Sequence, residues 1–76
     1  MKLTSAQERE IIMIESGATT EILLAPVRIA SIWFKLIDKK LVKVSQKNHH
    51  PILTGAGQAE YHRIFMRDVL KGKVQS

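Results

Sequence analysis

The residues most able to do chemistry gather in one short stretch, KLVKVSQKNHHP, where lysine, asparagine and histidine side chains surround a turn. Lys and Asn side chains are hydrogen-bond donors that suit phosphate oxygens. No carboxylate or thiolate joins His49, His50 or His62 at ligand spacing, so we expect no metal site. No serine has the context of a nucleophile and no pair of acids is placed for acid–base work. We therefore expect a binding protein, not an enzyme, and no cofactor.

Length and composition limit the chain to one domain over residues 1–76. The chain is 45% hydrophobic, which suffices for a single small core. It has no cysteine, which excludes disulfide bonds and fits a reducing compartment. The N-terminus turns polar at once, and no apolar run is long enough to span a bilayer. We expect a cytoplasmic protein that makes no membrane contact.

Charge divides the chain into two unequal parts. Residues 1–25 hold two cations against four carboxylates, a net charge of −2, whereas residues 26–76 hold ten against three, a net charge of +7. The second part would attract a polyanion and the first would repel it. The alternative is that the basic residues only keep the protein in solution.

The first half of the chain predicts helices. Ser5 and Glu8 fit a capping box that opens a helix over residues 5–16, and Gly17 can close it in the left-handed conformation. The apolar run 11–14 covers most of that helix's circumference, so we expect it to lie deep in the core. Residues 20–25 predict a short second helix, although the threonine pair before them could instead begin a strand. Pro26 ends that segment.

A strongly amphipathic helix is expected over residues 26–41. Its apolar stripe has the helical spacing i, i+3, i+4, i+7 and i+8, and the opposite side is polar and basic. Phe34 lies off the stripe, and we expect it to cover the short second segment; the alternative is an exposed partner-binding spot. The stripe is Ile29, Ile32, Trp33, Leu36 and Ile37, and the opposite side holds Arg28, Ser31, Lys35 and Lys39.

The second half predicts a β-hairpin over residues 42–53 and a helix over residues 55–70. Val42 and Val44 alternate with polar residues, as in a half-buried strand, and Pro51 restricts the return strand to an edge. Thr54 caps the last helix, and the tail 71–76 should fray. The fold class is therefore α+β, mainly α: three N-terminal helices, a two-stranded hairpin and a C-terminal helix.

This order resembles the winged helix-turn-helix DNA-binding family, in particular small bacterial and phage regulators of the MarR kind. FKLIDKKLVKV is similar to the end of the family's recognition helix, SQKNHHP occupies the place of its wing, and ILTGAGQAEY resembles its wing exit. The family favours glycine before its Leu-Val pair, where this chain has Lys40, so Lys40 is expected to take an uncommon conformation or the helix to end differently. The segment 17–26 is also shorter than in the family, which leaves room for only about one turn.

The resemblance implies double-stranded DNA as the partner and transcription regulation as the role. The recognition helix would enter the major groove and the wing would lie on the backbone or in the minor groove. An arginine can hold a guanine edge with two donors, and phosphate contacts would make binding strongly salt-dependent. Carried over by position, the DNA-binding residues are Arg28, Ser31 and Lys35 in the helix, with Lys39, Lys43, Lys47, Asn48, His49 and His50 after it.

Two further interactions are expected. A single module buries a modest area on DNA, on the order of 600–1,000 Å², so specific binding would need a homodimer, and the last helix offers Phe65, Val69 and Leu70 as its seam. The alternative function is a protein-interaction module without DNA binding, in which Phe34 contacts a partner. RNA binding is a weaker third, because only Phe34 and Tyr61 could stack on bases.

Overall fold

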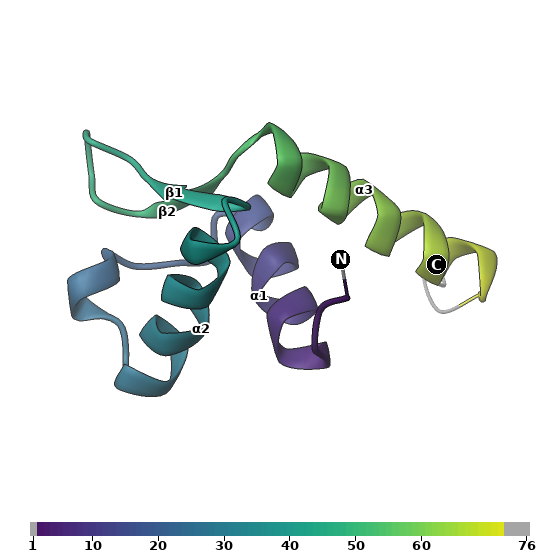
Figure 1. Cartoon of the computed structure of the whole chain (residues 1–76), viewed down its shortest axis with the longest axis horizontal. Helices are drawn as coiled ribbons and strands as arrows, with labels where there is room; N and C mark the ends of the chain where they lie inside the picture. The colour runs from purple at the N-terminus through teal and green to yellow at the C-terminus, as the bar shows by residue number, and fades with distance from the viewer. Residues whose placement is uncertain (1, 73–76) are drawn as a thin grey trace.

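The chain folds into a mainly helical α+β structure with one two-stranded hairpin (Figure 1). The computed structural model describes residues 2–72. Figure 1 shows α1 between α2 and α3, with the hairpin over the C-terminal ends of α1 and α2. The elements are α1 (Ser5–Ser16), η1 (Ile22–Leu24, a 3₁₀ turn), α2 (Val27–Asp38), β1 (Val42–Val44), β2 (Pro51–Leu53) and α3 (Gly55–Leu70).

Helix α1 begins with a capping box one residue earlier than predicted. The Thr4 hydroxyl accepts from the backbone N–H of Gln7, and the Gln7 side chain accepts from the Thr4 N–H, with N–O distances of 3.1 and 3.0 Å. Thr4, not Ser5, is thus the N-cap, and Glu8 is left free for another partner. Gly17 closes the helix at φ 82°, as predicted.

The core lies where α1, α2, the hairpin and the first part of α3 meet. Trp33 and Leu36 of α2 are buried in it, as their place on the apolar stripe predicts. The expectation that α1 is covered on most sides was wrong: Ile12 and Met13 are exposed, because only part of the helix surface faces a neighbour. The buried core cluster consists of Leu3, Ile11, Ile14, Ile22, Trp33, Leu36, Leu41, Val42 and Ile64, and Pro51 of the hairpin is also buried.

One carboxylate is buried in this core. Glu10 of α1 accepts a hydrogen bond from the indole Nε1–H of Trp33 in α2, with an N–O distance of 2.8 Å. A buried carboxylate without a partner costs much free energy, so this bond fixes how the two helices pack. Glu10 and Trp33 also line a small cavity of about 390 Å³ beside the segment that follows α1.

The predicted second helix is only a 3₁₀ turn. Ala25 is extended (φ −72°, ψ 148°), as expected before Pro26, so few residues remain for a helix after Gly17. The N-terminal half therefore holds two α-helices joined through η1, not three. Ile22 is buried, whereas Leu23 and Leu24 are exposed.

Helix α2 is shorter than the predicted range 26–41. Pro26 is its N-cap, and after Asp38 the chain leaves the helix through Lys40, a non-glycine residue at φ 64°. Lys40 N–H donates to the Ile37 carbonyl and Leu41 N–H to the Leu36 carbonyl, at 2.9 and 3.0 Å, which is the pattern of a Schellman motif. The uncommon conformation expected at Lys40 is thus present, and the helix ends there.

The hairpin is antiparallel, and its register pairs Val42 with Leu53, Lys43 with Ile52 and Val44 with Pro51. Both strands are edges, which is why Pro51 is tolerated. Helix α3 covers the residues predicted for it and is capped by Thr54, whose hydroxyl accepts from the Gly57 N–H at 3.1 Å. Of the predicted tail, residues 73–76 lie outside the described residues. Within residues 2–72, no helix is long and apolar enough to cross a membrane.

Candidate nucleic-acid interface

Helix α2 exposes polar side chains on the side opposite its buried stripe. Arg28, Ser31 and Lys35 follow one another at three- and four-residue spacing, and all three are exposed. Trp33 and Leu36 hold the other side of the helix in the core. Because residues at this spacing share one helix face, the three side chains form one outward row of hydrogen-bond donors.

The hairpin turn, residues 45–50, is held by its own hydrogen bonds. The His49 N–H donates to the Ser45 carbonyl, the Lys47 N–H to the Ser45 hydroxyl and the His50 N–H to Oδ1 of Asn48, at 2.9, 3.2 and 3.1 Å. The Asn48 amide oxygen is therefore used inside the turn. Lys47 and Asn48 are both exposed at its tip.

The two histidines of the turn have different surroundings. His49 is exposed and has a positive φ of 59°, and its carbonyl accepts from the Ile22 N–H of η1 at 3.0 Å. His50 is half-buried, and its Nδ1 lies 3.1 Å from the Thr19 hydroxyl oxygen, with which it shares a hydrogen bond. Both residues thus tie the turn to the segment before α2, and only the His49 ring is well exposed.

Lys39 and Lys43 flank the chain reversal between α2 and the hairpin. Lys39 caps the C-terminus of α2, where a cation also meets the negative end of the helix dipole. Lys43 is exposed on β1 and stands opposite Ile52, while its neighbour Val42 is buried. These two lysines and Lys40 place positive charge between the α2 row and the hairpin turn.

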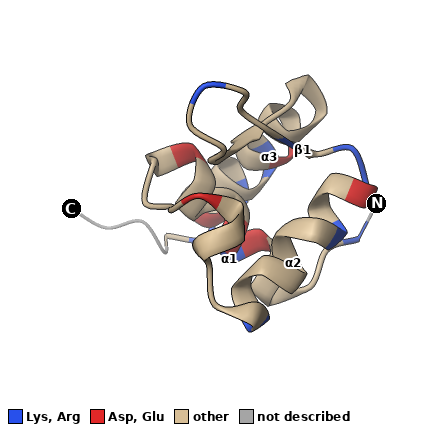
Figure 2. Cartoon of the chain, turned by 90° about the vertical axis from the view of Figure 1, so that its left-hand side faces the viewer, with Lys and Arg blue, Asp and Glu red and all other residues tan. Residues whose placement is uncertain are grey.

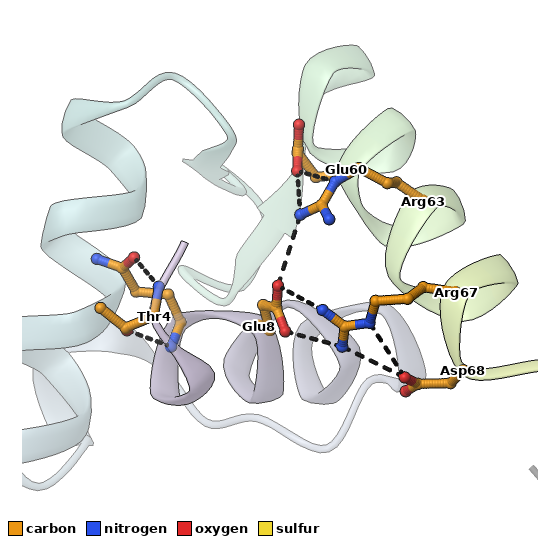
Figure 3. A network of polar contacts seen from close by, with 7 residues as sticks. Thr4, Glu8, Glu60, Arg63, Arg67 and Asp68 are labelled. Carbon is orange, nitrogen blue, oxygen red and sulfur yellow. Dashed lines mark hydrogen bonds and ion pairs between the residues drawn. The ribbon is translucent and has the colours of Figure 1, made fainter. Parts of the chain in front are cut away.

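The arginines of α3 are neutralised by carboxylates (Figure 3). Arg67 contacts Glu8 of α1 at 3.0 Å and Asp68 at 3.3 Å, and Arg63 contacts Glu60 at 2.8 Å and Glu8 at 3.6 Å. The hydrogen bond that Arg67 donates to the Glu8 carboxylate raises the pKa of Arg67 above its usual value. Glu8, which the sequence assigned to the α1 cap, therefore joins α1 to α3.

The cations on the other side of the molecule have no such partners. Within the described part of the chain, no ion pair involves Arg28, Lys35, Lys39, Lys43 or Lys47. Figure 2 faces this side and shows basic segments on α2, at the turn after it and in the hairpin turn, with a few acidic segments among them. Residues 26–53, which hold α2 and the hairpin, carry six cations against one carboxylate, a net charge of +5 that lies apart from the paired arginines of α3.

An apolar groove runs along the same face of α2. Phe34 is 53% exposed, which corrects the expectation that it is covered by the second segment; the 3₁₀ turn is too short to cover it. Leu23 and Val27 flank the groove with exposures of 85% and 86%. We call it the η1–α2 groove. It is an open groove with a volume of about 780 Å³, lined mainly by Ile22, Leu23, Val27, Ser31, Phe34, Lys35 and Asp38.

The sequence predicted Phe34 as a candidate here but missed Leu23 and Val27. The available signal was a second stripe on α2: positions 27, 30, 31, 34, 35 and 38 share helical spacing and all line the groove. The first stripe, which holds Trp33 and Leu36, is the more apolar of the two, so the second is harder to recognise in the sequence.

The predicted dimer residues lie on α3. Phe65, Val69 and Leu70 are exposed, Leu70 by 80%, and the Phe65 ring stacks on Tyr61 with a centroid distance of 6.3 Å. These side chains form a partly exposed apolar strip on α3.

Within residues 2–72, no group of three or more His, Cys, Asp or Glu side chains is placed to hold a metal ion. Comparison of the chain with protein-family models, with curated proteins and with solved structures finds no match.

Proposed function

We propose that the chain is a small winged-helix protein, similar to MarR-type bacterial and phage regulators, that binds double-stranded DNA. Helix α2 would be the recognition helix in the major groove, and the hairpin turn would be the wing on the phosphate backbone. The observation that carries the proposal is the division of charge: the α3 arginines are paired with carboxylates, while the cations of α2 and the hairpin are not.

The residues of α2 and those of the hairpin would contact different parts of the DNA. Arg28 can hold a guanine edge with two parallel donors, and Ser31 and Lys35 lie on the same helix face. Lys43 and Lys47 would contact phosphates, which position the protein without reading sequence. The apolar strip of α3 is the proposed homodimer seam, which would place a second recognition helix on the DNA.

A salt titration of binding to random duplex DNA, followed by fluorescence anisotropy, tests the proposal. We expect the logarithm of the affinity to fall linearly with the logarithm of the salt concentration. Replacing Lys43 and Lys47 by Gln should reduce the slope by about two, because each lost phosphate contact lowers it by about one.

The matched control is Lys71→Gln, an exposed lysine just after α3. It removes charge without touching α2 or the hairpin, so it should change the slope little. Equal slopes for the control and the Lys43/Lys47 variant would refute the proposed orientation, and no binding at low salt would refute DNA binding itself.

Protein binding is a second candidate function, and one observation favours it. The outward face of α2 is not purely polar, because Phe34 and Val27 stand among its donors and border the η1–α2 groove. A large exposed apolar patch on a protein surface often marks a site of interaction with another protein.

A further inference from the structure

We infer that the η1–α2 groove binds an acidic amphipathic helix of a partner protein. The inference deepens the second candidate function by naming the occupant. It rests on proposed DNA binding in one respect only: the occupant would compete with DNA for α2.

The shape of the groove fits a helix. One wall is the whole of α2, about 18 Å long at 1.5 Å per residue, because lining positions recur from Val27 to Asp38. The other wall is η1, whose Leu23 projects from it. Such an open groove would leave a small ligand largely in water, whereas a helix laid along it can insert apolar side chains at i, i+3, i+4 and i+7.

The charge around the groove favours a partner that carries negative charge. Arg28 lies at one end of α2, Lys35 lines the groove, and Lys39 and Lys40 follow the other end. Two carboxylates oppose these four cations, because Asp38 lines the groove and the exposed Glu21 precedes η1, which leaves a net charge of +2. None of these four cations has an ion pair within the described residues. A partner helix with carboxylates beside its apolar stripe would meet a net positive charge around the groove.

The same geometry sets up competition with DNA. Ser31 and Lys35, which would face the major groove, also line the η1–α2 groove. A helix seated there covers both side chains, so the protein cannot hold that helix and a duplex on α2 at once. An acidic occupant would thus act as a switch on DNA binding.

The test uses a fluorescein-labelled peptide about three turns long, held helical by one Lys–Glu lactam bridge, with Leu at i, i+3, i+4 and i+7 and Glu at the remaining positions. Binding to the full chain is followed by anisotropy. We expect Leu23→Ser and Phe34→Ala each to weaken binding about tenfold, since each removes a large apolar contact. A peptide with Lys in place of Glu should bind at least about tenfold more weakly.

Leu24→Ser is the matched control, because Leu24 is 72% exposed on the same turn but does not line the groove. The Leu24→Ser variant should bind the peptide as tightly as the unchanged chain does. Equal affinities for Leu23→Ser and Leu24→Ser, or for the Glu and Lys peptides, would overturn the inference. Loss of self-association in Leu23→Ser by analytical ultracentrifugation would also overturn it, since a second copy would then fill the groove.

DNA competition separates this inference from the proposed function. If the peptide binds and displaces duplex DNA, both are supported. If the peptide binds and no duplex binds at low salt, DNA binding fails while the groove assignment holds. If duplex binds and the peptide does not, the groove assignment alone fails.

Discussion

Gly57 lies where α3 passes closest to the chain reversal after α2, and replacing it by alanine tests that packing. A β-carbon at Gly57 would overlap the carbonyl oxygen of Leu41 and lie 3.2 Å from Cβ of Leu53. The same carbonyl accepts from the Thr54 N–H at 3.0 Å, so it cannot move away without breaking that bond. The first turn of α3 would therefore have to shift.

The size of the effect follows from two opposing terms. Overpacking against backbone costs about 3 kcal/mol, at the upper end of its usual range, because neither partner can rotate away. The better helix propensity of alanine returns up to about 1 kcal/mol. We expect Gly57→Ala to lower the free energy of unfolding by about 2 kcal/mol, and Tm by about 8–16 °C for a domain of this size.

Gly55→Ala is the control for propensity without a clash. It stands in the same turn of α3, and a β-carbon there meets nothing within 4 Å. We expect it to raise stability by about 0.4–1 kcal/mol. Thermal unfolding followed by far-UV circular dichroism compares the two variants. If Gly57→Ala melts at or above the temperature of Gly55→Ala, the close approach of α3 to Leu41 is wrong.

Two further predictions concern stability, both measured by urea denaturation. Lys40→Gly should raise the free energy of unfolding by up to about 1 kcal/mol, because glycine relieves the left-handed conformation by more than it adds to the entropy of the unfolded chain. Lys39→Gly, at φ −82°, should instead lower the free energy of unfolding. If Lys39→Gly were the more stable of the two variants, the assignment of the helix end would be contradicted. Trp33→Phe should cost about 1–3 kcal/mol by leaving buried Glu10 without its donor. Glu10→Gln keeps an acceptor oxygen and should cost less, so an equal loss would show that the bond contributes little.

Local signals predicted most of the elements, because capping residues, glycine and proline act over a few positions. Gly17 and Thr54 each mark a boundary that the structure has, whereas α2 ends at Asp38, three residues before its predicted end. The helix α1 begins at Ser5 as predicted, but its cap was assigned one residue too late because both Thr4–Gln7 and Ser5–Glu8 fit a capping box. The choice is made by tertiary contacts: Glu8 is bound by Arg63 and Arg67 from α3, which no local pattern reveals.

The candidate site was harder to predict because burial depends on what lies opposite. The spacing of α2 placed Trp33 in the core and the donor row outside it, and both are where the period puts them. Phe34 was misjudged because the short segment expected to lie against it forms only the turn η1, which leaves Phe34 53% exposed. The η1–α2 groove lies between this turn and the helix.

The tie between the hairpin turn and η1 has a consequence for the energetics of any partner. Fixing the backbone of one residue costs roughly 1–2 kcal/mol of conformational entropy. Residues 45–50 are fixed by bonds within the turn and by the contacts of His49 with Ile22 and of His50 with Thr19. This entropy is lost when the chain folds, not when a ligand binds. The turn is therefore a preorganised surface, and a ligand that contacts it binds with a more favourable free energy than it would to a flexible turn.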